Sequence, residues 1–150
     1  MRRKERMLTD SEALSILEEG EYGILSTVSP DNEPYGIPLN YCVMNGRIYF
    51  HSAIEGTKIA NIENNPAVSF CVVAGARVLS ERFTSLYESC IVSGTAAEAS
   101  GSEKQNALEM LIHKYSGSHI PEGLEYIEKL KNKTRVFSIS IESITGKANR

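Results

Sequence analysis

The residues best suited to chemistry lie close together, where a short apolar strand sequence gives way to a helix. They are two hydroxyls, an imidazole, a glycine and a lysine: His51, Ser52, Gly56, Thr57 and Lys58. A phosphate monoester is bound by such groups, namely hydroxyl and amide donors, a cation and the positive end of a helix. Gly56 lets backbone approach an anion closely, and Lys58 supplies a point charge. We therefore expect a phosphorylated cofactor here, with His51 facing its reactive end.

The same residues also have an explanation that needs no ligand. Lys58 can be a solvated helix residue, and Thr57 a residue of the first helical turn. His51, with an ordinary pKa near 6.5, can move a proton near neutral pH or can only hydrogen-bond a cofactor. The residues alone leave both interpretations open.

A hairpin must position this stretch. Asn45-Gly46 separates two apolar runs and is the strongest signal in the chain for a two-residue type I′ turn. It predicts that a strand over 34–44 pairs antiparallel with a strand over 47–52. A helix over 56–64 then follows, and Asn65-Pro66 ends it.

The rest of the chain shows strand and helix periods in turn. A capping box, Thr9 with Glu12, begins a first helix. Pro38 requires an edge or a bulge because proline cannot donate to the ladder, and Gly94 indicates a bulge. Further strands are expected at 22–28, 67–74, 85–98 and 137–142, and further helices at 102–116 and 122–131.

The order of these elements indicates the fold class. About six strands in hairpin-rich order predict a mainly β fold, a small antiparallel barrel with flanking helices, rather than a βαβ sheet. With 150 residues and 41% hydrophobic content, the chain can bury one core. We therefore expect a single domain over 1–150.

Composition narrows the class of partner. The net charge is −3, so no overall field attracts nucleic acid or a membrane. No apolar run follows the basic start of the chain, and no segment is long enough to span a bilayer. Three separated cysteines, Cys42, Cys71 and Cys90, fit neither a disulfide framework nor a zinc site and indicate packed thiols. We expect a soluble, cytoplasmic protein.

Several further segments form a recognisable pattern with the Asn-Gly hairpin and the basic start. They are Pro-Tyr-Gly-Ile-Pro-Leu-Asn-Tyr (34–41), Phe-His-Ser-Ala (50–53), Glu-Gly-Thr-Lys (55–58), Asn-Pro-Ala-Val (65–68), Leu-Tyr-Glu-Ser (86–89) and Ile-Thr-Gly-Lys (144–147). Together they resemble the FMN-binding split-barrel superfamily of pyridoxamine-phosphate oxidase, and within it the 5-nitroimidazole-resistance proteins. The resemblance covers nearly the whole chain. It implies a six-stranded antiparallel split β-barrel that forms a homodimer, with FMN at the interface.

The resemblance also assigns cofactor contacts by position. Along the flavin it places Ile37, Pro38, Leu39 and Tyr41. On the ribityl chain and phosphate it places His51, Ser52, Gly56, Thr57 and Lys58. Ser89 matches a strand position that contacts flavin in the oxidases, and the histidine that matches His51 is implicated in nitro-group reduction. Arg2 and Arg3 either reach the partner subunit's phosphate or form a free basic terminus.

The chain departs from the oxidases at several cationic positions. Thr57 stands where the oxidases place an Arg beside the Lys. Gly36 replaces an Arg, Tyr41 replaces a Lys, and a C-terminal Arg–His pair is missing. A phosphorylated substrate would meet few cations, so vitamin B6 oxidation is not expected.

The function expected from the resemblance is an FMN-dependent oxidoreductase. It would take electrons from a reduced pyridine nucleotide or another donor and pass them to a small, planar, electron-poor acceptor, with His51 assisting protonation as the catalytic residue. A second hypothesis is a non-catalytic flavin-binding or sensing protein. A third is that the pocket takes haem or a deazaflavin, as in some split-barrel relatives.

Overall fold

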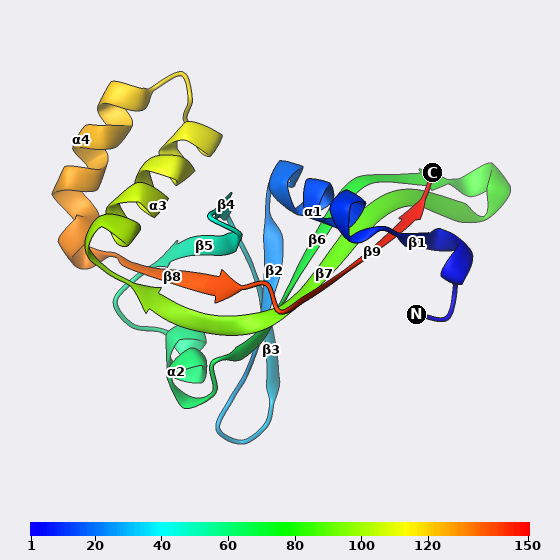
Figure 1. Ribbon diagram of the computed structural model, residues 1–150, viewed down its shortest axis with the longest axis horizontal. Coiled ribbons are helices and arrows are strands. Elements are labelled where there is room, and N and C mark those ends of the chain that lie inside the picture. Colours follow the sequence, from blue (N-terminus) through cyan, green and yellow to red (C-terminus); the bar gives the residue numbers. More distant parts are fainter.

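The computed structural model describes every residue of the chain, Met1–Arg150. Its nine strands form one antiparallel sheet, in which seven follow the order β3-β2-β6-β7-β8-β5-β4 (Figure 1). β9 lies outside this order and pairs with both β7 and β1. The strands are β1 (Met7–Leu8), β2 (Gly23–Val28), β3 (Pro34–Leu39), β4 (Cys42–Met44), β5 (Arg47–Ser52), β6 (Ala67–Leu79), β7 (Thr84–Ala99), β8 (Arg135–Ser140) and β9 (Ser143–Asn149).

The sheet does not close into a complete barrel, because β3 and β4 end the strand order without pairing with each other. The expected number of six strands is wrong. The expected strand 34–44 is broken at Asn40-Tyr41 into β3 and β4, and the closing strand is followed by a second one, β9. Pro38 lies in β3, an edge strand, as its missing N–H requires.

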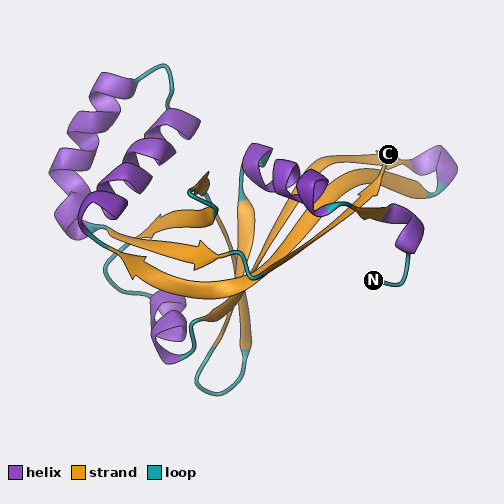
Figure 2. Ribbon diagram, viewed as in Figure 1, coloured by secondary structure: helices purple, strands orange, loops and turns teal.

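Helices lie at the margins of the sheet and make the chain a mixed, sheet-rich fold (Figure 2). None of them is long and apolar enough to cross a membrane. The capping box of the first helix is confirmed, with Thr9 and Glu12 each accepting a hydrogen bond from the other's N–H. The helices are α1 (Asp10–Glu19), α2 (Thr57–Asn64), α3 (Gly101–Tyr115) and α4 (Ile120–Leu130), with short 3₁₀ turns η1 (Lys4–Arg6), η2 (Ser80–Arg82) and η3 (Lys131–Lys133).

The hairpin that carries β5 forms as predicted. Asn45 and Gly46 have φ angles of 53° and 69°, the positive pair that a type I′ turn requires. The turn pairs Met44 with Arg47, and β5 also pairs along its whole length with β8. The last residues of β5 are therefore fixed from the neighbouring strand.

The buried side chains form two clusters on opposite sides of β5. The larger lies between the sheet and α1, and Phe50 of β5 stacks there on Phe137 of β8 with ring centres 5.6 Å apart. The smaller lies under α3 and α4, where Tyr49 packs with Leu111 and Ile127. Burial of both faces explains why β5 reads as an unbroken apolar run before His51.

Two of the cysteines are packed thiols, as the sequence indicates. Cys42 and Cys90 are buried, and Cys71 is partly buried. Burial raises the pKa of the Cys42 and Cys90 thiols to about 11, so both are protonated at neutral pH.

β7 changes partners along its length, and Gly94 marks the change. The strand pairs with β9 up to Ser93 and with β8 from Ala96. Gly94 is not a bulge, because its pairing with Val68 is regular; the register shift in the β6–β7 ladder lies nearer the hairpin tip. A side chain at Gly94 would overlap the backbone carbonyl of Ser140, so glycine is required here by close approach.

Replacing Gly94 by Ala should therefore destabilise the protein by more than about 2 kcal/mol, because backbone rather than a flexible side chain must move. Gly36→Ala is the matched control, since a Cβ there meets Ile24 and Ser26 only at ordinary contact distances. Denaturant unfolding of both variants measures the difference. Equal stability of the two variants would contradict the close approach of Gly94 to the backbone of Ser140.

Candidate functional site

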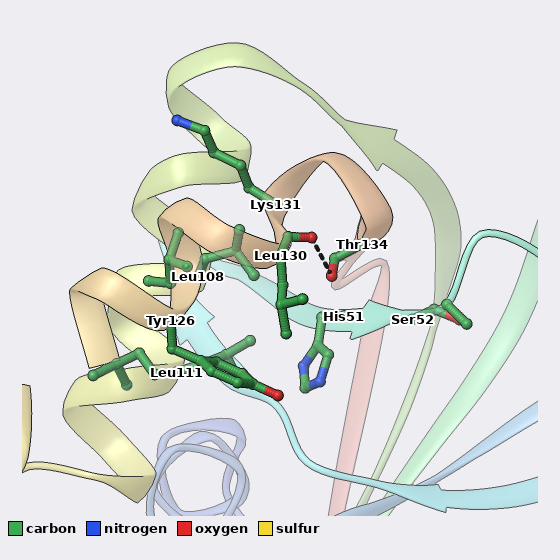
Figure 3. A pocket seen from close by; sticks show the side chains of 11 residues that line it. His51, Ser52, Leu108, Leu111, Tyr126, Leu130, Lys131 and Thr134 are labelled. Atoms are coloured by element: carbon green, nitrogen blue, oxygen red, sulfur yellow. Dashed lines mark hydrogen bonds between the residues drawn. The ribbon is translucent and has the colours of Figure 1, made fainter. Parts of the chain in front are cut away.

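The last two residues of β5 present their side chains to opposite sides of the sheet. Ser52 follows the inward face of Ile48 and Phe50, whereas His51 lies on the same face as Tyr49, toward α3 and α4. Figure 3 shows the His51 and Ser52 side chains pointing away from each other. The strand end therefore supplies an imidazole on one side and a hydroxyl on the other.

His51 forms part of the wall of a pocket between β5 and the α3–α4 hairpin. The pocket has a volume of about 280 Å³, and seven of its 11 lining residues are hydrophobic. The Tyr126 hydroxyl end points toward the His51 ring, whereas Lys131 points away and pairs with Glu128 at 2.9 Å (Figure 3). The lining residues are His51, Ser52, Ala53, Leu108, Leu111, Ile112, Tyr126, Ile127, Leu130, Lys131 and Thr134. An apolar slot with few polar groups suits a flat ring.

The protein around His51 alters its protonation. Although the side chain is partly exposed, loss of water around the ring holds its pKa below the ordinary 6.5, and the charge of Lys58 acts in the same direction. His51 is therefore mainly neutral at pH 7, with one nitrogen that donates and one that accepts.

On the other side of the strand end lies a corner that fits an anion. Gly56 is the N-cap of α2 with φ 151° and no capping side chain, so the first amides of the helix have no side-chain partner. A Cβ at Gly56 would meet nothing within 4 Å. Thr57 is exposed, and Lys58 makes no ion pair.

Ser52 is the last residue of β5, just before the loop to α2. Its side chain is 4% exposed, and its buried Oγ has no hydrogen-bond partner. A buried hydroxyl without a partner costs free energy, and such groups are rare in folded proteins. Ser52, Gly56, Thr57 and Lys58 lie between the end of β5 and the first turn of α2.

The residues expected along the flavin from the longer strand are divided between two faces of β3. Ile37 and Leu39 are partly buried and pack against the larger core, whereas Pro38 is exposed on the outer face. Tyr41 does not line the pocket. Its ring is fully buried, packs edge-on against Phe70 at 4.8 Å, and its hydroxyl donates to the carbonyl of Leu17. Within one chain Tyr41 is a core residue, and its expected contact with the flavin stays a prediction.

Ser89 also lies away from His51 within one chain. It sits in the half of β7 that pairs with β9, and its Oγ donates to the carbonyl of Lys147 at 3.3 Å. The structure adds two residues that the sequence did not single out, Tyr126 of α4 and Arg135 at the start of β8. The only signal for Tyr126 was the helix expected at 122–131, and nothing in the sequence distinguishes Arg135.

A protein-family model described as pyridoxamine 5'-phosphate oxidase matches residues 9–148 of the chain. A comparison with curated proteins found no significant match.

Solved structures share the fold at low sequence identity. A candidate 5-nitroimidazole antibiotic resistance protein from Bacteroides thetaiotaomicron is 20% identical with a TM-score of 0.76, over 96% of this chain and 90% of that one. An FAD-binding protein from Mesorhizobium loti is 24% identical with a TM-score of 0.68, over 97% and 98%. The FAD and haem binding protein from Mycobacterium smegmatis is 16% identical with a TM-score of 0.83, over 97% and 74%. At these identities the likeness establishes the fold alone.

The unpartnered hydroxyl of Ser52 gives a direct test of the corner. Ser52→Ala should leave the melting temperature of the flavin-free protein unchanged or raise it slightly, because no hydrogen bond is lost and a buried polar atom is removed. The same change should weaken binding of a phosphorylated flavin by roughly tenfold. A lower melting temperature with unchanged flavin affinity would show that the hydroxyl serves the fold only.

Proposed function

The chain belongs to the pyridoxamine 5'-phosphate oxidase family, and on that premise we propose that it binds FMN where β5 meets α2 and reduces a small, electron-poor acceptor. The observations that carry this proposal are the buried, unpartnered Oγ of Ser52 at the end of β5 and the uncapped N-terminus of α2 that follows it in the chain. A group with several strong hydrogen-bond acceptors and negative charge satisfies both features at once.

The phosphate would be held by three kinds of donor. The hydroxyls of Ser52 and Thr57, the ammonium of Lys58 and the first amides of α2 can share its charge, and each charge-assisted bond contributes about 1.5–3 kcal/mol. Gly56 leaves the space around these amides open. These donors can bind a terminal, doubly ionised phosphate such as that of FMN, which supports FMN as the flavin.

The pocket on the other side of the strand end would take the flat part of the cofactor or the acceptor. Its apolar wall, with Leu108, Leu111 and Leu130, excludes water from a ring lying against His51. A bound flavin would supply electron transfer from a reduced pyridine nucleotide or similar donor to the acceptor. His51, neutral at pH 7, would pass the proton of one ring nitrogen to an acceptor oxygen and take up a replacement proton from water at the other nitrogen.

A second copy of the chain would complete the site. A row of directly opposed residues, Pro38, Ile24, Cys71 and Ile91, crosses four strands on the outer face of the sheet. Ile91 is 49% exposed, and Val73 beside it is 53% exposed. This uncharged row also borders Ser89. A homodimer that buries it would bring Ser89 and Pro38 toward the flavin of the other subunit.

Lys58 offers the simplest test of where the phosphate lies. Lys58→Ala should weaken FMN binding by about one to two orders of magnitude, or about 1.5–3 kcal/mol, because a charge-assisted bond is lost. The matched control is Lys129→Ala, an exposed helical lysine of α4 without an ion pair. Fluorescence titration with FMN measures both. Equal affinity in the two variants would place the phosphate elsewhere.

Anaerobic turnover tests the activity itself. The holoprotein should oxidise a reduced pyridine nucleotide with a nitroaromatic or quinone acceptor, and His51→Ala should lower kcat by roughly 10²-fold through loss of proton transfer. His113→Ala, an exposed histidine of α3, is the control. Holoprotein that turns over no such acceptor with any reduced donor would limit the chain to flavin binding.

A further inference from the structure

Arg135 joins three separate parts of the chain around the proposed phosphate corner. It begins β8 and lies directly opposite Ser52 in the β5–β8 ladder. Its Nε and Nη2 donate to the two carboxylate oxygens of Glu98 on β7 at 2.9 and 2.7 Å. Nη2 also donates to Glu63 of α2 at 3.0 Å, and Nη1 donates to the carbonyl oxygen of Ile54 at 3.2 Å. One guanidinium therefore binds the sheet, the helix and the loop between them.

The loop between β5 and α2 has little else to hold it. Among residues 53–55, the bond from Arg135 to the Ile54 carbonyl is the one hydrogen bond that the structure contains. Gly56, which follows, has a φ of 151°. Glycine has little conformational preference, so Gly56 itself does not fix the direction of the chain at the start of α2. Arg135 is therefore what fixes the path of the chain from Ser52 to the first amides of the helix.

Charge balance argues against direct contact between Arg135 and an anion. Its guanidinium lies between two carboxylates, Glu98 and Glu63, so the three side chains together carry a net negative charge. The fork is further occupied by the Ile54 carbonyl. A phosphate would meet Lys58, which has no ion pair, before it met Arg135.

We propose that Arg135 is a positioning residue for phosphate recognition, acting through Ile54 and Glu63 to aim the amides of α2 and Lys58 at one point. This inference rests on the proposed binding of FMN. Because the loop and α2 would grip the phosphate and not the ring system, loss of Arg135 should weaken binding of FMN while leaving binding of riboflavin, which lacks the phosphate, nearly unchanged.

The experiment compares the dissociation constants of FMN and riboflavin, by fluorescence titration of the full chain freed of flavin. Arg135→Gln should raise the FMN constant at least about tenfold and change the riboflavin constant by less than about twofold. Arg47→Gln is the matched control, because it removes the same charge at the other end of the β5–β8 pair, where Arg47 is exposed and makes no ion pair.

Glu63→Gln separates positioning from direct contact. Glu63 is 59% exposed, so this variant keeps the fold even if Arg135→Gln does not. Positioning predicts weaker FMN binding, because the neutral amide of glutamine holds the Arg135 guanidinium less strongly than the carboxylate does. Direct contact predicts tighter FMN binding, because a negative charge beside the anion has been removed.

The outcomes distinguish this inference from the function on which it rests. A wild-type chain that binds no flavin refutes the proposed function, and this inference with it. A wild-type chain that binds FMN overturns the positioning role alone if Arg135→Gln weakens FMN and riboflavin equally, or if Glu63→Gln tightens FMN binding.

Discussion

The alternation of side chains along β5 is the constraint on which the site depends. Phe50 is fixed by its stacking on Phe137, and β5 pairs with β4 over Arg47–Tyr49 and with β8 along its whole length. The next two residues must then point to opposite sides of the sheet. One side receives the His51 imidazole in an apolar pocket, and the other receives a buried hydroxyl beside the start of α2. A cofactor with a flat ring at one end and an anion at the other can use both sides of one strand end.

The two cations near this corner, Arg135 and Lys58, differ in their ion pairs. Arg135 is paired with Glu98 and Glu63, and the hydrogen bonds that it donates to these carboxylates raise its pKa further. Lys58 makes no such pair and lowers the pKa of His51 from a distance. Arg135 holds the loop before α2 in place, whereas Lys58 can pair with a bound anion. An anion bound at Lys58 would offset its effect on the ring, so occupation of the corner and protonation of His51 are coupled.

Local signals in the sequence predicted local structure well. The Asn45-Gly46 turn, the Thr9–Glu12 capping box, the start of α2 and the edge position of Pro38 all follow from backbone chemistry that neighbouring residues determine. The number of strands could not be predicted in this way, because the break at Asn40-Tyr41 and the pairing of β9 depend on contacts between residues distant in sequence. The burial of Tyr41 could not be predicted for the same reason, since its hydroxyl finds a partner only when α1 packs beneath it. Arg135 could not be singled out, because its three partners come from β7, α2 and a loop.

The most direct test of the central claim is the absorbance spectrum of the freshly purified protein, together with the mass of the cofactor released on denaturation. The account predicts the visible bands of a bound flavin and the mass of FMN, one per chain. Colourless protein that takes up no FMN when it is supplied, or a spectrum of haem or of a deazaflavin, would contradict it.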